Sequence, residues 1–256
     1  MKLHPILLLS FLVWSLASCD SIDEADRYKG PLQLEVKKNV LIEDFTGQLC
    51  LNCPLAAEAI GNMQKTYGNE HIIAVALHGG DLSIDAPYGL ATEESKAYHT
   101  YWKVDTWPKG VVDRSGGTLE YTSWSAKAVE RLQLEPTLSI DMSGNTYDAD
   151  SRQLTVRVAI DGTLPGGSQL QVWLTESNIT ALQRMPNGEY NAEYVHNHVL
   201  RQCVNGQWGE PIASTGEVVY SDISLPADWK AEDMAVVAFV YNDEGVAQVI
   251  DVPVVQ

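Results

Sequence analysis

Residues 40–54 read VLIEDFTGQLCLNCP, an apolar run that leads into Cys-x-x-Cys-Pro and then into a segment with helical periodicity. Cys50 and Cys53 are therefore expected at a helix start, where unpaired N–H groups and the helix dipole stabilise a thiolate. Cys50 precedes the helix and should be the more exposed, reactive sulfur. Cys53, in the first turn beside Pro54, would be the resolving thiol.

The same cysteine spacing forms half of a zinc site, which is the alternative to redox chemistry. Zinc needs four ligands, and the chain contains no second CxxC and no HxxxH sequence. The pattern therefore favours a redox pair over a metal site, and no cofactor is expected.

Hydrophobic periodicity around this stretch predicts an α/β domain over residues 31–135. Strands are expected at Val40–Phe45 and His71–Leu77, with a helix at Leu55–Tyr67 between them. A right-handed crossover makes the two strands parallel and places the CxxC at the C-terminal edge of the sheet. The remaining expected elements are a helix at 91–104, a hairpin at 110–121 and a helix at 123–134 capped by Ser123.

This order of elements, with three short motifs, resembles the thioredoxin superfamily. The motifs are the CxxC-Pro on a strand-to-helix junction, Asp44-Phe45 six residues before the first cysteine, and Thr106-Trp107-Pro108-Lys109-Gly110 ahead of a strand. The resemblance implies that Asp44 moves protons for the resolving thiol, a role for which Glu43 competes, and that Pro108 follows a cis peptide bond. An ordinary charged residue at a strand end is the alternative for Asp44.

The chain also departs from the thioredoxin pattern near the cysteines. Leu49 stands where the family has tryptophan, and Trp107 is bulky where a substrate backbone would dock. His78, at the expected end of the second strand, would lower a thiol pKa if it lay nearby in protonated form. A solvated loop histidine is the alternative for His78.

The second part, residues 136–256, has no helical periodicity and alternates like β-strands. Seven runs bounded by turn residues, among them 154–160, 170–175, 235–241 and 246–254, predict an all-β sandwich of immunoglobulin-like architecture. His196 and His198 would share one face of a strand and supply two ligands to a metal, although a structural role is favoured. Cys203 is expected to be a small buried residue rather than a reactive thiol. Trp173, Trp208 and Trp229 would stack on sugars if exposed, or else fill the core.

The N-terminus carries export signals. Residues 1–18 read as a signal peptide whose Leu-Ala-Ser-Cys ending resembles a bacterial lipobox, which implies lipidation of Cys19 and a membrane anchor. An ordinary secretory signal is the alternative. The acidic tether 19–30 is either a plain linker or a loose surface-export signal, and Ser21 lies in a sequence that resembles a Bacteroidetes O-glycosylation acceptor. A net charge of −17 makes nucleic acid an unsuitable partner.

Taken together, the lipobox, the CxxC segment, the Pro108 loop and the strand at 196–201 resemble the Bacteroidetes outer-membrane-protein-twenty-eight lipoproteins. That resemblance implies an envelope location and a thioredoxin-like domain followed by a sandwich. The leading hypothesis is an outer-membrane lipoprotein, periplasmic or surface-exposed, that exchanges disulfides with protein thiols. The alternative is a surface binding or adhesion protein with a host or glycan ligand, in which the CxxC is a structural disulfide.

Overall fold

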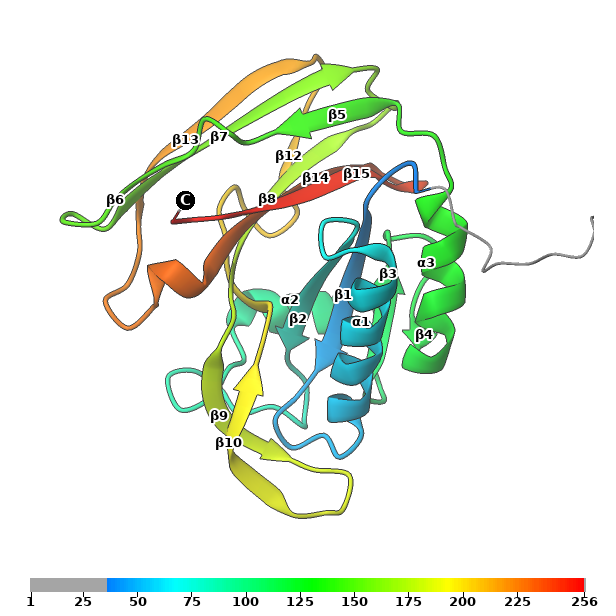
Figure 1. Ribbon diagram of the computed structural model, residues 1–256, viewed down its shortest axis with the longest axis vertical. Coiled ribbons are helices and arrows are strands. Elements are labelled where there is room, and N and C mark those ends of the chain that lie inside the picture. The colour runs from blue at the N-terminus through cyan, green and yellow to red at the C-terminus, as the bar shows by residue number, and fades with distance from the viewer. Residues whose placement is uncertain (1–35, 256) are drawn as a thin grey trace, which may run out of the picture. The chain divides into compact units, whose positions relative to one another are not determined.

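The structure is a computed structural model of the 256-residue chain and describes residues 36–255 (Figure 1). The expected signal peptide, the lipidation site Cys19, the tether and the glycosylation site Ser21 lie outside the described residues. Within the described part of the chain, no helix is both long enough and apolar enough to cross a bilayer.

The first half folds around the parallel strands β1 (Val40–Thr46) and β2 (Ile72–His78), which α1 (Cys53–Tyr67) connects. On the other side of β1, β3 (Lys109–Val112) pairs antiparallel, and the short β4 (Leu119–Glu120) follows it. The strand order β2-β1-β3-β4 contains the two predicted pairings, β1 with β2 and β3 with β4, and adds the pairing of β1 with β3.

Three helices cover the two faces of these strands. On one face, α1 packs beside α3 (Trp124–Leu132) in one apolar cluster, with Val40 and Ile42 of β1 beneath them. On the other face, α2 (Glu93–Tyr101) contributes Tyr98 to a second cluster. The predicted helices are confirmed, but Ser123 makes no side-chain capping bond because the 3₁₀ turn η1 (Tyr121–Ser123) leads directly into α3.

The sheet does not end at residue 135, where the sequence predicts a domain boundary. Beyond β2 it continues through strands of the second half, in the order β11, β8, β14 and β15. Their bounds are β8 (Gln169–Glu176), β11 (Val199–Cys203), β14 (Met234–Asn242) and β15 (Gly245–Pro253), and β12 (Glu210–Pro211) pairs with β8 off this path. One nine-stranded mixed sheet therefore runs through both halves of the chain.

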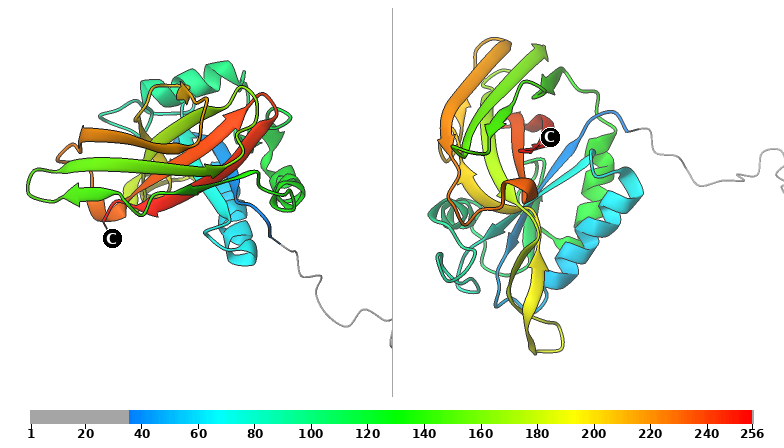
Figure 2. Two further views of the ribbon diagram at one scale, coloured as in Figure 1. Left: turned by 90° about the horizontal axis from the view of Figure 1, so that it is seen from above. Right: turned by 60° about the vertical axis from the view of Figure 1, so that its left-hand side comes forward.

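A smaller four-stranded sheet packs over the second-half strands (Figures 1 and 2). It contains β5 (Leu138–Asp141), β6 (Thr146–Asp148), β7 (Gln153–Gly162) and β13 (Gly216–Ser224). Alternate residues of β7 from Leu154 to Ile160 point inward and share a core with Leu170, Val172 and Val236 of the large sheet. The period-two pattern read from the sequence corresponds to this buried face. A 3₁₀ turn, η2 (Ala231–Asp233), precedes β14.

A separate two-stranded hairpin, β9 (Ile179–Arg184) and β10 (Tyr190–His196), extends from the second half to the start of α1 (Figure 1). The sequence predicts one strand through Tyr194–Arg201. Instead the chain turns after His196, because His198 adopts a left-handed φ of 57° before β11 begins. His196 and His198 consequently do not share a strand face.

Candidate functional site

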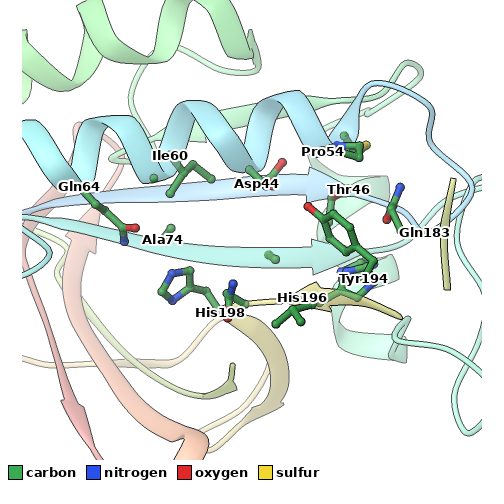
Figure 3. A pocket seen from close by; sticks show the side chains of 17 residues that line it. Asp44, Thr46, Pro54, Ile60, Gln64, Ala74, Gln183, Tyr194, His196 and His198 are labelled. Atoms are coloured by element: carbon green, nitrogen blue, oxygen red, sulfur yellow. The ribbon is translucent and has the colours of Figure 1, made fainter. Parts of the chain in front are cut away.

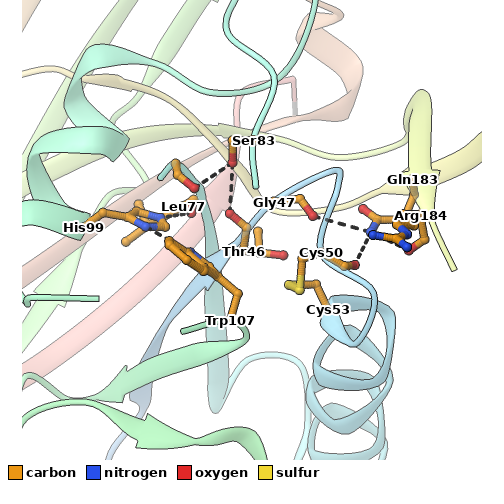
Figure 4. Close-up of a disulfide and its surroundings, with 11 residues drawn as sticks. Thr46, Gly47, Cys50, Cys53, Leu77, Ser83, His99, Trp107, Gln183 and Arg184 are labelled. Carbon is orange, nitrogen blue, oxygen red and sulfur yellow. Dashed lines mark hydrogen bonds between the residues drawn. A yellow bond between two sulfur atoms is a disulfide. The ribbon is translucent and has the colours of Figure 1, made fainter. Parts of the chain in front are cut away.

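Cys50 and Cys53 form a disulfide at the start of α1, with Asn52 at the N-cap and Pro54 in the first turn (Figure 4). Both sulfur-bearing residues are buried, with 1% of Cys50 and 3% of Cys53 exposed. The expectation that Cys50 is the more exposed of the pair is wrong. The physical reason is a segment that lies far away in the sequence.

The β9–β10 hairpin covers the CxxC loop. The side-chain amide of Gln183 donates to the carbonyl oxygen of Cys50 at 2.9 Å and to that of Gly47 at 3.4 Å. The backbone N–H of Arg184 donates to the Gln48 carbonyl at 2.7 Å, and the Gln48 side chain donates to Leu182 at 3.1 Å. Figure 4 shows Gln183 and Arg184 beside the disulfide loop. The sequence around Gln183 contains no motif that predicts this contact, which joins residues more than 130 positions apart.

The acidic neighbours Glu43 and Asp44 are both buried on β1, and their alternation along the strand sends them to opposite faces of the sheet. Glu43 pairs with Arg114 through two hydrogen bonds of 3.1 and 3.2 Å. Burial raises the pKa of Glu43, and the guanidinium opposes that rise. Glu43 is therefore committed to an ion pair, which leaves Asp44 as the carboxyl on the side of the disulfide.

Among the described residues, no charged side chain pairs with Asp44. Its Oδ1 is buried without a hydrogen-bond partner among the described residues, and burial raises its pKa from 3.8 to about 8. Since a lone carboxylate is costly to bury, Asp44 is a neutral acid below that pH.

Asp44 and Cys53 line one cavity of about 140 Å³ between α1, the sheet and the hairpin (Figure 3). His78 from the end of β2 and His196 from the end of β10 line the same cavity, with ring centroids 5.2 Å apart. His78 Nδ1 and His196 Nε2 are buried and lack hydrogen-bond partners in the described chain. A polar cavity of this size accommodates several water molecules, at roughly 30 Å³ each, and water would satisfy these three atoms.

Of the histidines that line the cavity, His78 and His196 are uncharged at neutral pH. Burial, followed by the neighbouring His196 and His99, holds the pKa of His78 well below 6.5. Burial lowers the pKa of His196 to about 4. His78 thus lies near Cys53 as one sequence alternative held, but it is neither solvated nor protonated and does not lower a thiol pKa by its charge.

The Trp107–Pro108 peptide bond is cis, as the thioredoxin resemblance implies, and so is Ala86–Pro87. The indole N–H of Trp107 donates to His99 Nδ1 at 3.2 Å, and His99 Nε2 lies 2.7 Å from the Leu77 carbonyl. Gly80 lies under the indole, where a Cβ atom would come within 2.2 Å of the ring. Trp107 is therefore a fixed side chain rather than a freely moving one.

The remaining candidate residues take structural places. Cys203 in β11 is buried, with its sulfur 3.8 Å from the Tyr98 hydroxyl, and burial raises its pKa to about 12. His198 lines the cavity, and its carbonyl accepts from the N–H of Ala76. Across residues 36–255, no three histidine, cysteine or acidic side chains are arranged to hold a metal ion.

Comparison with known families matches residues 95–256 to the model of outer membrane protein Omp28. The chain belongs to the Omp28 family. This membership assigns it to the outer membrane proteins and hence to the cell envelope. The match begins inside α2, so it does not include the disulfide or Asp44, and the Omp28 assignment by itself says nothing about redox chemistry.

Among solved structures, the Omp28 chain is similar to HBP35 of Porphyromonas gingivalis, with a TM-score of 0.68 and 18% sequence identity. The similarity covers 86% of this chain and 76% of HBP35. At this identity the likeness concerns the fold alone. No curated protein matches the sequence.

Proposed function

We propose that this Omp28 protein is a thiol–disulfide oxidoreductase of the cell envelope that acts on protein thiols or disulfides through Cys50 and Cys53. The observation that carries the proposal is the shared cavity: an unpaired, buried carboxyl borders the same space as the disulfide at a helix N-terminus. A purely structural disulfide has no need of a neutral acid beside it, and unpaired carboxyls with raised pKa values gather at functional sites.

The exchange would begin with the reduced pair. The Cys50 thiolate attacks a client disulfide, a Cys50–client bond forms, and one client sulfur leaves as a thiolate. Asp44 first gives its own proton to water in the cavity and then, as the carboxylate, takes the proton of the Cys53 thiol. The Cys53 thiolate then attacks the Cys50 sulfur, re-forms the Cys50–Cys53 bond and releases the second client sulfur. A thiol reductant must supply the two electrons for the next cycle.

The histidines fit the handling of that proton. His196 Nε2 and His78 Nδ1 are uncharged and buried beside the cavity, and neither has a hydrogen-bond partner in the part of the chain that the structure describes. Water held between them and Asp44 would provide a route for the proton to solvent. A client must also displace the hairpin, since Gln183 holds the Cys50 carbonyl. The proposal therefore includes opening of the β9–β10 hairpin before exchange.

The parts of the chain outside the described residues complete the proposal. Lipidation at Cys19 would anchor the protein to the membrane and leave the thioredoxin-like domain, residues 31–135, to face its clients on an acidic tether that carries a glycan at Ser21. Cys19→Ala should move the protein from the membrane fraction into the soluble fraction. If the Cys19→Ala protein stays membrane-bound and acyl-labelled, the proposal that Cys19 carries the anchor is wrong. If the intact mass shows no glycan, the proposal that Ser21 is glycosylated is wrong.

The experiment that tests the redox proposal is trapping of mixed disulfides in cells. Cys53→Ala should accumulate disulfides between Cys50 and client proteins, because no resolving thiol remains. Cys50→Ala should trap far fewer. If neither variant traps clients, and the reduction potential lies below about −300 mV, where structural disulfides typically fall, the catalytic role is wrong.

The second candidate is a binding protein whose immunoglobulin-like sandwich meets a host or glycan ligand. The burial of both sulfurs favours it, because 1% and 3% exposure is typical of structural disulfides. The reduction potential separates the two candidates, since a structural disulfide is the more resistant to reduction.

A further inference from the structure

We propose that an aromatic pocket on the α2-covered face of the large sheet binds a neutral saccharide. This site is separate from the redox chemistry and does not depend on it. The pocket has a volume of about 510 Å³ and is lined by four aromatic side chains, Tyr101, Trp102, Trp208 and Tyr241. Pockets of this size with aromatic walls and a few polar groups are the usual form of small-molecule sites.

Two of the aromatic residues in the pocket are exposed to solvent. Tyr101 is 60% exposed and Trp208 is 37% exposed, with their ring centroids 4.5 Å apart. Adjacent exposed aromatic rings on a soluble surface mark a binding site more often than isolated ones do. The sequence suggested three tryptophans that could stack on sugars. Of these, Trp173 is fully buried, whereas Trp208 is exposed and lines this pocket.

The walls are held in place before any ligand arrives. Trp208 packs edge-on against the buried ring of Tyr98 at 4.8 Å, and its carbonyl accepts a hydrogen bond from the Tyr241 hydroxyl at 2.6 Å. The Arg114 guanidinium carbon lies 4.2 Å from the centre of the Tyr241 ring. Rings that are already ordered lose little conformational entropy on binding, which favours affinity.

The charges around the pocket point to an uncharged ligand. Arg114 lines the pocket, and its guanidinium, which forms an ion pair with Glu43, is the positive group in the wall that disfavours a cation. Asp243 lines the same pocket and, with the net charge of −17, disfavours an anion. A neutral occupant with an apolar ring face is what these surroundings accept.

Polar atoms in the wall match hydroxyl groups. Gln169 and Asp243, which line the pocket, supply donors and acceptors. A sugar ring presents C–H groups on its faces, which stack on aromatic rings, and hydroxyls around its edge, which donate and accept hydrogen bonds. This combination distinguishes a saccharide from a purely apolar ligand.

The test is direct binding to the full chain. Four neutral oligosaccharides, maltohexaose, cellohexaose, mannohexaose and chitohexaose, are titrated while tryptophan fluorescence and saturation-transfer NMR are recorded. At least one should bind, and Tyr101→Ala and Trp208→Ala should each weaken that binding at least about tenfold. Tyr88→Ala, at a residue that is 91% exposed and outside the pocket, should leave it unchanged.

Tyr101 lies on the surface, so Tyr101→Ala remains informative if Trp208→Ala fails to fold. Choline chloride serves as the cationic probe and should not bind. If none of the four oligosaccharides binds, if the Tyr101 variant binds as well as the unmodified chain, or if choline binds instead, the saccharide assignment is overturned.

Discussion

Glu43 and Asp44 are adjacent in the sequence, lie on the same strand and are both buried, yet they have opposite surroundings. Glu43 faces Arg114, whose guanidinium is also close to four aromatic rings, those of Tyr98, Trp173, Phe239 and Tyr241. Asp44 faces a polar cavity and has no charged partner within residues 36–255. A buried ion pair is costly to break, whereas a buried carboxyl with no counter-charge keeps a raised pKa and is available for proton transfer.

Glu43 and Arg114 are not the only buried ion pair among the described residues. At the start of β1, the ammonium group of Lys38 lies 2.5 Å from Asp113, which also pairs with Arg131 at 2.9 Å. Asp113 further accepts from the backbone N–H of Leu41, and Lys38 donates to the carbonyl of Val246. These contacts join β1, α3 and β15, so compensated charge connects the two halves of the chain.

The largest effect should appear in the pH dependence of stability, and it comes from Asp44. Its folded pKa of about 8 exceeds the ordinary 3.8, so the unfolded chain releases the proton first as the pH rises. The folded state therefore loses stability between about pH 4 and pH 8, by on the order of 5 kcal/mol at 1.36 kcal/mol per pKa unit. The Asp44→Asn variant should not show this loss of stability. The measurement is the free energy of unfolding in urea across that pH range.

The unmodified chain and the Asp44→Asn variant share every other titrating group, including His78 and His196. The difference between their curves of stability against pH therefore gives the contribution of Asp44 alone. Parallel curves for the unmodified chain and Asp44→Asn would show that the carboxyl is charged in the folded state. The contrast with Glu43 would then have no basis.

The next effect is that of Glu43→Gln, which leaves the Arg114 guanidinium buried without a counter-charge. Breaking one side of a buried ion pair typically costs about 3–5 kcal/mol, so the free energy of unfolding at pH 7 should fall by that amount. Asp44→Asn is the matched control on the neighbouring residue and should be neutral or stabilising at the same pH. Equal destabilisation by both substitutions would contradict the division between the two faces.

The smallest effect concerns the hairpin that covers the unpaired side. Gln183→Ala removes the hydrogen bonds to Cys50 and Gly47, each worth about 1 kcal/mol net. Reduction of the Cys50–Cys53 disulfide by dithiothreitol, followed by thiol labelling, should become about tenfold faster. Asn187→Ala, at the tip of the same hairpin, removes two hydrogen bonds to Glu189 and none to the CxxC loop, so it should leave the rate unchanged. An unaltered rate in the Gln183 variant would mean that the hairpin does not limit access.

Local patterns in the sequence were sufficient for the first half of the fold. The strands and helices around Cys50–Pro54 follow from periodicity, because each is set by residues close in the chain, whereas the cis bond before Pro108 was implied by the thioredoxin resemblance. The order of the later strands was not accessible in the same way. That Val199 of β11 pairs with Ala76 of β2 is a contact between distant segments, and nothing in either strand's own pattern specifies its partner.

The sequence identified the cysteines and the neighbouring carboxyl groups of the site, but not the residues from distant segments that surround them. The choice between Glu43 and Asp44 could have been narrowed from alternation, since only one of two neighbouring strand residues faces α1. The partner that decides the matter, Arg114, lies 71 residues away from Glu43. Gln183 and Tyr194 are likewise far from the site in the sequence. They reach it only because β9 and β10 fold back onto it.

The most direct test of this account is a carbon-13 NMR titration of the aspartate carboxyl groups in the oxidised full chain, with the Asp44 signal assigned from Asp44→Asn. The account predicts a midpoint of about 8 for Asp44, because burial without a partner disfavours the carboxylate. A midpoint near the ordinary 3.8 would show a charged, solvated or paired carboxyl, and the proposed proton acceptor for Cys53 would be lost.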